Sequence, residues 1–205
     1  QAPPVTTTDW QVVLPVPAGA PPPPATHYKH GKPSKRWCYR DAAGQVLMWV
    51  YRFDKRGGNK MFAPVTFCEK EGEQAWRWKS LPPPRPLYRA EELAARPDAV
   101  VIVCEGEKAA DAAAQLLPDC VATCSPNGSN SAGKADWTPL YKRRVVVWPD
   151  YDDAGREYMA AVARALKDQV ADLEKIRLPL AGTPEPGGLV SAESREPPPG
   201  WDAAD

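Results

Sequence analysis

Two short apolar segments that each lead into acidic residues constrain the fold of this chain more than any other feature. The first, 99–104, is followed directly by Glu105. The second, 145–148, is followed by Asp150 and Asp152. Runs of β-branched residues of this length are typical of buried strands, and an alanine-rich segment of helical character follows each one. Strand–helix units in this order form a mostly parallel sheet that binds ligands at its carboxyl edge, so we expect the three carboxylates there.

Three carboxylates at one sheet edge also indicate a chemistry. Glu105, Asp150 and Asp152 would repel one another strongly unless divalent cations neutralised them. Carboxylate oxygens that leave room for water and phosphate are ligands suited to Mg²⁺ or Mn²⁺. The pattern therefore predicts a metal-dependent phosphoryl-transfer centre, with these three residues as both the catalytic groups and the metal ligands.

The residues after the two strands form a pattern. The pattern is Glu-Gly after one strand and Asp-x-Asp with Ala-Gly after another, at Glu105, Gly106, Asp150, Asp152, Ala154 and Gly155. The combination resembles the Toprim domain of primases, type II and IA topoisomerases and related nucleases. The segments 84–88 and 125–140 are similar to the primase half of phage and plasmid primase-helicase proteins, a DnaG-type catalytic core, and the resemblance runs from about residue 28 to the end.

The resemblance implies a DNA primase fragment that makes short primers on single-stranded DNA from nucleoside triphosphates in phage, plasmid or prophage replication. It leaves Glu105 as either a general base or a third metal ligand. Two alternatives stay open: a Toprim metal-dependent nuclease of the overcoming-lysogenization type, and a non-catalytic nucleic-acid-binding module. A topoisomerase would need a tyrosine nucleophile in a separate DNA-binding domain, for which 205 residues are too few.

Two further groups of residues are candidates for ligand binding. The first flanks a predicted hairpin turn and would bind template phosphates, although solvated lysines and arginines at a turn need no such role. The second would bind the nucleotide through a cation on the first helix and a glycine-rich loop, although that loop also fits an ordinary connection. Asp153 is expected to cap the helix that follows it. The nucleic-acid candidates are Arg52, Lys55, Arg56 and Lys60, and the nucleotide candidates are Lys108, Asn127, Gly128, Asn130 and Lys134.

The predicted organisation is an α/β Toprim domain, with a central four-stranded, mostly parallel sheet, preceded by a small antiparallel β subdomain. Strands are expected near 10–14, 36–40, 45–53, 60–68, 75–79, 99–104, 121–124, 145–148 and 175–178, and helices near 89–95, 107–117, 137–141 and 154–170. The segments are an extended proline-rich linker (1–35), the β subdomain (36–80), a connector with a short helix (81–98), the catalytic domain (99–180) and a proline- and glycine-rich tail (181–205).

Composition limits the partners and cofactors. Lysine plus arginine and aspartate plus glutamate each number 26, so any nucleic-acid contact must be localised on one face. Five cysteines with two distant histidines make zinc an unexpected ligand, and the cysteines are expected to be reduced. No P-loop and no long apolar span occurs, so we expect a cytoplasmic protein without a membrane partner and without a P-loop ATP site. Residues 200–205 resemble part of a further motif of the primase-helicase proteins, which implies a helicase or ATPase part in the same natural chain.

Overall fold

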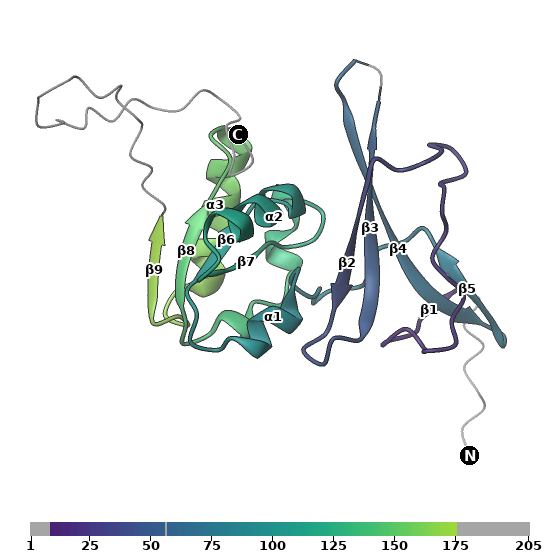
Figure 1. Cartoon of the computed structure of the whole chain (residues 1–205), viewed down its shortest axis with the longest axis horizontal. Coiled ribbons are helices and arrows are strands. Elements are labelled where there is room, and N and C mark those ends of the chain that lie inside the picture. Colours follow the sequence, from purple (N-terminus) through teal and green to yellow (C-terminus); the bar gives the residue numbers. More distant parts are fainter. Residues whose placement is uncertain (1–8, 56, 176–205) are drawn as a thin grey trace, which may run out of the picture.

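The computed structural model describes residues 9–55 and 57–175, which form two sheets side by side (Figure 1). The first sheet is antiparallel and the second is parallel with flanking helices, so the predicted fold class is confirmed. The strands are β1 (Gln11–Val12), β2 (Lys35–Arg40), β3 (Val46–Asp54), β4 (Lys60–Lys70), β5 (Glu73–Arg77), β6 (Val101–Cys104), β7 (Val121–Thr123), β8 (Arg144–Trp148) and β9 (Asp172–Lys175). The helices are α1 (Ala90–Ala95), α2 (Glu107–Leu116) and α3 (Asp153–Leu166), with 3₁₀ turns η1 (Ser129–Lys134) and η2 (Thr138–Leu140).

The antiparallel sheet has the strand order β1-β4-β3-β2, and β5 also pairs with β4. Its segments are rich in aromatic and β-branched residues, which favour strands. In the β3–β4 hairpin, Arg52 lies opposite Phe62. The turn of this hairpin contains Gly57 and Gly58, with φ angles of +89° and +82° that glycine adopts without steric penalty. The sequence therefore places a tight turn where the two longest strands of the sheet meet.

Side chains alternate along each strand, so this sheet has two distinct faces. The pairing of Trp37 with Val50, and of Val50 with Pro64, places these residues on one side of the sheet. This side, the inner face, is directed toward the parallel sheet, because its β2 side chains contact α2. The inner face includes Lys35, Trp37, Tyr39, Met48, Val50, Arg52, Lys60, Phe62 and Pro64.

The opposite face of the sheet is covered by the proline-rich N-terminal segment. Trp76 Nε1 donates a hydrogen bond to the carbonyl oxygen of Pro21 at 2.7 Å, and Tyr51 Oη donates to that of Pro24 at 2.8 Å. Polyproline backbone makes no internal hydrogen bonds, so its carbonyls accept from these aromatic donors. The sequence predicted a linker over residues 1–35. Its described part, 9–34, instead packs on the sheet as a covering layer and contributes β1.

His27 lies in this covering segment, and only 6% of its surface is exposed. Its ring packs against Phe53 and Trp78, and its Nδ1 accepts a hydrogen bond from the backbone N–H of Lys29. Burial lowers the pKa of His27 below its ordinary value of 6.5, and the charges of His30 and Lys29 lower it further. The folded protein therefore holds His27 neutral at pH values where the unfolded chain would protonate it.

This shift predicts a pH-dependent stability. At pH values between the lowered pKa of His27 and 6.5, the unfolded chain binds more protons than the folded protein. The free energy of unfolding therefore increases with pH in this range and decreases on acidification. We expect the thermal midpoint of the wild type to decrease as the pH is lowered from about 8 to about 5. His27→Gln is expected to lower the midpoint at every pH but to show a smaller pH-dependent fall. Parallel pH profiles for the two proteins would contradict this assignment.

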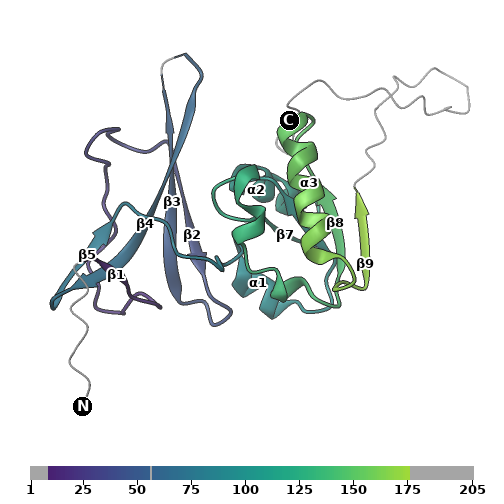
Figure 2. The same cartoon turned by 180° about the vertical axis from the view of Figure 1, so that it is seen from behind.

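The parallel sheet has the order β7-β6-β8-β9 and carries helices on both faces. Val101 and Val103 of β6 pack against α3, whereas Ile102 and Cys104 pack against the alanines of α2. Figure 2 shows α3 lying across one face of this sheet. Burial on both sides explains why β6 is a continuous apolar run instead of an alternating one. Among the described helices, none is long and apolar enough to cross a membrane.

The C-terminal end of this sheet differs from the prediction. The alanine-rich pattern predicted a helix over 154–170, but α3 ends at Leu166. Asp168 adopts a φ of +61°, a left-handed conformation that aspartate tolerates and that ends the helix. The backbone N–H of Ala171 then donates to the carbonyl of Arg143, which leads the chain into β9 three residues before the predicted strand. The predicted tail, 181–205, lies outside the described residues.

Candidate active site between the two sheets

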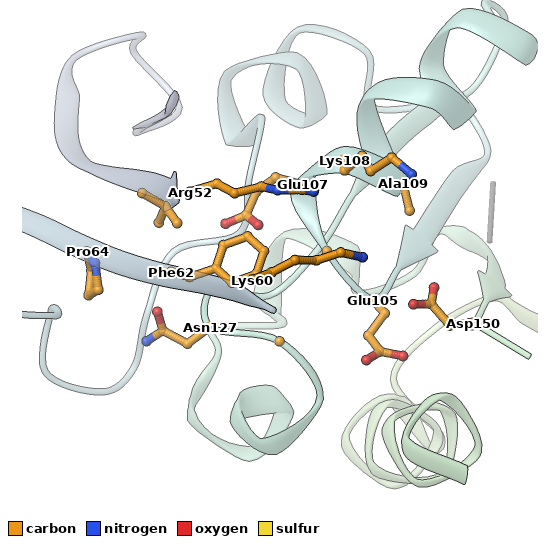
Figure 3. A pocket seen from close by; sticks show the side chains of 13 residues that line it. Arg52, Lys60, Phe62, Pro64, Glu105, Glu107, Lys108, Ala109, Asn127 and Asp150 are labelled. Carbon is orange, nitrogen blue, oxygen red and sulfur yellow. The ribbon is translucent and has the colours of Figure 1, made fainter. Parts of the chain in front are cut away.

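A cavity of about 530 Å³ lies between the inner face of the antiparallel sheet and the carboxyl edge of the parallel sheet (Figure 3). One wall comes from β3 and β4, and the other from the first turn of α2 and the loops after β6, β7 and β8. This volume is in the range of small-molecule and cofactor sites. The lining residues are Val50, Arg52, Lys60, Phe62, Pro64, Glu105, Gly106, Glu107, Lys108, Ala109, Asn127, Gly128 and Asp150.

Glu105 and Asp150 are brought together by strand register. β6 and β8 are parallel neighbours, with Cys104 opposite Trp148 as the last residue of each strand. Glu105 therefore follows β6 at the same edge where Asp150 follows β8, two residues beyond the strand end. Both side chains lie at the same end of the cavity in Figure 3. Two of the three predicted carboxylates are thus side by side, as expected for neighbouring parallel strands.

The third carboxylate, Asp152, has a defined structural role. Its Oδ1 accepts a hydrogen bond of 2.7 Å from the backbone N–H of Gly155, which makes Asp152 the N-cap of α3. The prediction that Asp153 caps this helix is wrong: Asp153 is its first residue and forms an ion pair with Arg156. A side-chain acceptor at the N-cap satisfies a backbone N–H that the helix itself leaves unbonded. Asp152 is not among the residues that line the cavity.

The described residues fit a Mg²⁺ or Mn²⁺ ion at Glu105 and Asp150. Within residues 9–55 and 57–175, no group of three or more His, Cys, Asp or Glu side chains forms a ready metal cluster. Magnesium, however, is usually held by one or two carboxylates together with water and substrate phosphates, not by an all-protein cage. A pair of hard oxygen donors that opens onto a cavity meets this requirement.

Cationic side chains lie around the carboxylates. Arg52 and Lys60 project from the inner face of the sheet, and Lys108 from the first turn of α2, and all three line the cavity (Figure 3). Arg52 is oriented by an ion pair of its Nε with Asp54 at 2.8 Å. Lys55 is exposed in the hairpin turn and is not a lining residue. Two residues of the predicted hairpin cluster, Arg52 and Lys60, therefore line the cavity, while Arg56 lies outside the described residues.

The glycine-rich loop after β7 contributes Asn127 and Gly128 to the cavity. Both have positive φ angles, +71° and +69°, and the Asn127 side chain donates to Ser80 Oγ at 3.1 Å. Lys134 lies at the far end of η1 and does not line the cavity, and its carbonyl accepts from the backbone N–H of Arg85. The side chain of Asn130 is outside the described part of the chain. The loop thus reaches the site through its first half.

Several lining residues were not predicted from the sequence. Phe62 and Pro64 alternate with Lys60 on β4, so the period of a strand would have placed them on the same face once Lys60 was placed there. Glu107 also lines the cavity, yet it is only 4% exposed, and its Oε1 accepts a hydrogen bond from Tyr39 Oη at 2.8 Å. Burial raises the pKa of the Glu107 carboxyl above its ordinary value.

Glu107 and Asp111 of α2 connect the two sheets. They are four residues apart and therefore on the same helix face. Opposite them, alternate residues of β2 supply hydrogen-bond donors: Tyr39 bonds to Glu107, while Trp37 Nε1 and Lys35 Nζ bond to Asp111 at 2.8 and 2.9 Å. Asp111 Oδ1 accepts a further bond from Tyr88 Oη at 3.0 Å. This contact holds the cationic inner face in front of the carboxylates.

Replacing Asp111 by alanine is expected to weaken this contact. The change leaves Trp37 Nε1 and Tyr88 Oη without their acceptor, and an unsatisfied polar group in a largely buried place costs about 1–3 kcal/mol. We expect the free energy of unfolding, measured in urea, to fall by about 2–4 kcal/mol. The half-exposed ion pair with Lys35 adds little to this value.

Asp119→Ala is the matched control, because Asp119 is an exposed acidic residue in the loop just after α2. It should change the free energy of unfolding by less than about 0.5 kcal/mol. Equal stabilities of the Asp111 and Asp119 variants would show that the acidic face of α2 does not hold the two sheets together.

One similar solved structure is the primase fragment of the bacteriophage T7 primase-helicase protein, with a TM-score of 0.47 and 16% identity over 70% of this chain and 52% of that one. A second contains the T7 lagging-strand DNA polymerase with primase domains bound to an RNA/DNA hybrid and dTTP; its TM-score is 0.46, with 18% identity over 70% of this chain and 65% of that one. Both matches are to primases.

The chain spans about half the length of the T7 primase fragment that it matches. No family model and no curated protein matches the sequence. The roles of the site residues therefore depend on their chemistry and arrangement in this chain.

Proposed function

We propose that this chain carries the catalytic part of a DNA primase, which joins nucleotides on a single-stranded template by metal-dependent nucleotidyl transfer. The observation that supports this proposal most is that Glu105 and Asp150 face Arg52 and Lys60 across one cavity. Carboxylates alone fit many metal sites. A cationic wall facing them adds the ability to bind phosphate groups, which both substrates of a primase carry.

The reaction forms a bond between the 3′ oxygen of one nucleotide and the α-phosphorus of the next, and breaks the bond to the pyrophosphate leaving group. Mg²⁺ or Mn²⁺ bound at Glu105 and Asp150 would activate the attacking hydroxyl and neutralise charge on the phosphate oxygens. Two roles fit Glu105: ligand, or acceptor of the proton from that hydroxyl. The strand ends fix both carboxylates before substrate arrives, so little reorganisation is needed.

The remaining lining residues divide between the two substrates. Lys108 lies in the first turn of the helix that follows Glu105, so its ammonium is placed to pair with the triphosphate of the incoming nucleotide. The backbone of Asn127 and Gly128, with consecutive positive φ angles, supplies polar groups on the same side of the cavity. Arg52 and Lys60, on the opposite wall, would bind phosphates of the template strand.

A nuclease is the second candidate, since the same carboxylates would equally serve attack by water on a phosphodiester. The experiment that separates the two uses a single-stranded DNA template, labelled nucleoside triphosphates and Mn²⁺, with parallel reactions lacking the triphosphates or containing EDTA. Short labelled products that require template, triphosphate and metal support the primase. DNA cleavage that requires only the metal supports the nuclease.

A third measurement covers the case in which neither product forms. Mn²⁺ binding, followed by electron paramagnetic resonance, reports on the carboxylate pair without requiring turnover. If the wild type neither makes products nor binds Mn²⁺ at this site, both the primase and the nuclease assignments are contradicted.

A further inference from the structure

Phe62 is an exposed aromatic residue in a position that the folding of the sheet does not explain. It is 43% exposed, although it lies on the inner face of a sheet whose other aromatic residues on that face, Trp37 and Tyr39, are buried. Among the large hydrophobic side chains that the structure finds exposed, Phe62 is the one that lines the cavity with the carboxylates; the others are Leu14, Tyr28, Leu116 and Tyr141. Its ring therefore presents apolar surface to whatever occupies this cavity.

The Phe62 ring packs against a second aromatic ring of the inner face. It stacks on Trp37, with ring centroids 6.3 Å apart and planes inclined by 25°. Trp37 is 2% exposed, and its Nε1 donates to Asp111 of α2, so the supporting ring is fixed by both sheets. An aromatic surface held in this way loses little conformational freedom when a second ring stacks on it.

Cations lie on both sides of this ring. Arg52 is the cross-strand partner of Phe62, and Lys60 is two residues earlier on the same strand and therefore on the same face. Figure 3 shows the side chains of Lys60 and Arg52 next to the Phe62 ring. An apolar ligand would gain nothing from these charges, whereas a flat ring joined to phosphates would use all three side chains. Nucleotides have this chemistry.

We propose that Phe62 is the stacking platform for an unpaired base of a single strand that lies across β3 and β4, with Arg52 and Lys60 on its phosphates. This inference rests on the proposed function, because it takes the occupant of this wall to be the template. Stacking on an aromatic ring accepts every base, so the platform would position the template next to the carboxylates without reading its sequence.

The test measures binding of a fluorescent single-stranded oligonucleotide by anisotropy without divalent metal, so that catalysis plays no part. Phe62→Leu, which keeps most of the side-chain volume, is expected to weaken binding about 10-fold, whereas Phe62→Trp retains it. An abasic oligonucleotide with the same phosphates should bind the wild type and Phe62→Leu equally. Tyr141→Leu, an exposed aromatic residue outside the cavity, is the matched control and should bind both oligonucleotides as the wild type does.

Salt dependence separates stacking from charge. Phe62→Leu should leave the slope of log affinity against log salt unchanged, and Lys60→Gln should reduce it by about 0.7. Equal affinity of the wild type and Phe62→Leu for the base-containing strand would overturn the proposal. A loss seen for nucleoside triphosphates but not for the strand would also overturn it, because the platform would then belong to the incoming nucleotide.

The stacking platform at Phe62 and the proposed primase function would be contradicted by different results. Primer synthesis that is unaffected by Phe62→Leu at limiting template would retain the primase and reject the platform. Base-dependent binding through Phe62 in a protein that makes no primers would retain the platform and reject the primase.

Discussion

Asp150→Asn is expected to reduce metal-dependent activity by more than about 100-fold, because several kcal/mol of transition-state stabilisation are attributed to a catalytic metal ion. Asparagine has nearly the shape of aspartate but no charge, so the change removes half of the negative charge of the Glu105–Asp150 pair. Mn²⁺ affinity should fall together with the rate. The measurement is primer synthesis at saturating template, with a parallel titration of Mn²⁺.

A control variant in the same segment tests whether this effect is specific to Asp150. Asp153→Asn is the control, since Asp153 is an exposed acidic residue in the same segment and forms an ion pair with Arg156. Its activity should stay within about twofold of the wild type. Equal losses in the two variants would mean that Asp150 has no special place in the reaction.

Gly155→Ala is expected to disturb both the fold and the site. A Cβ atom at position 155 would lie 2.0 Å from the carbonyl oxygen of Asp150 and 2.8 Å from its carbonyl carbon. These are backbone atoms, so no rotamer change relieves the contact. Either the first turn of α3 or the loop that carries Asp150 must move. Overpacking of this kind costs about 1–3 kcal/mol, and we expect the upper end because the contact is so short.

The sign of this effect makes the test decisive. In the absence of a clash, alanine would stabilise a helix by about 1 kcal/mol relative to glycine. Gly133→Ala is the control, because a Cβ there meets nothing within 4 Å. Urea unfolding should show a clear loss for the Gly155 variant and little change for the Gly133 variant, and Mn²⁺ affinity should fall only in the former. A Gly155→Ala protein as stable as the wild type would show that this close contact does not constrain Asp150.

The sequence by itself determined the parallel sheet and the position of two carboxylates. β6 and β8 are short apolar runs, and their local composition is enough to predict buried strands. The residues that follow such strands lie at the carboxyl edge of a parallel sheet. The hairpin of β3 and β4 was predicted for the same reason, since strand period and turn glycines are local signals. Glu105 and Asp150 could therefore be placed without knowledge of any distant contact.

Only the tertiary structure decided which other side chains join them. Arg52 and Lys60 face the carboxylates, whereas Lys134 does not, because the face of a strand and the path of a loop depend on packing between segments far apart in the sequence. The exposure of Phe62 likewise could not be predicted from the sequence, since the packing of its ring against Trp37 depends on the contact of β2 with α2. The local sequence pattern determines which residues follow a strand end. The packing of the two sheets against each other determines which residues form the opposite wall of the site.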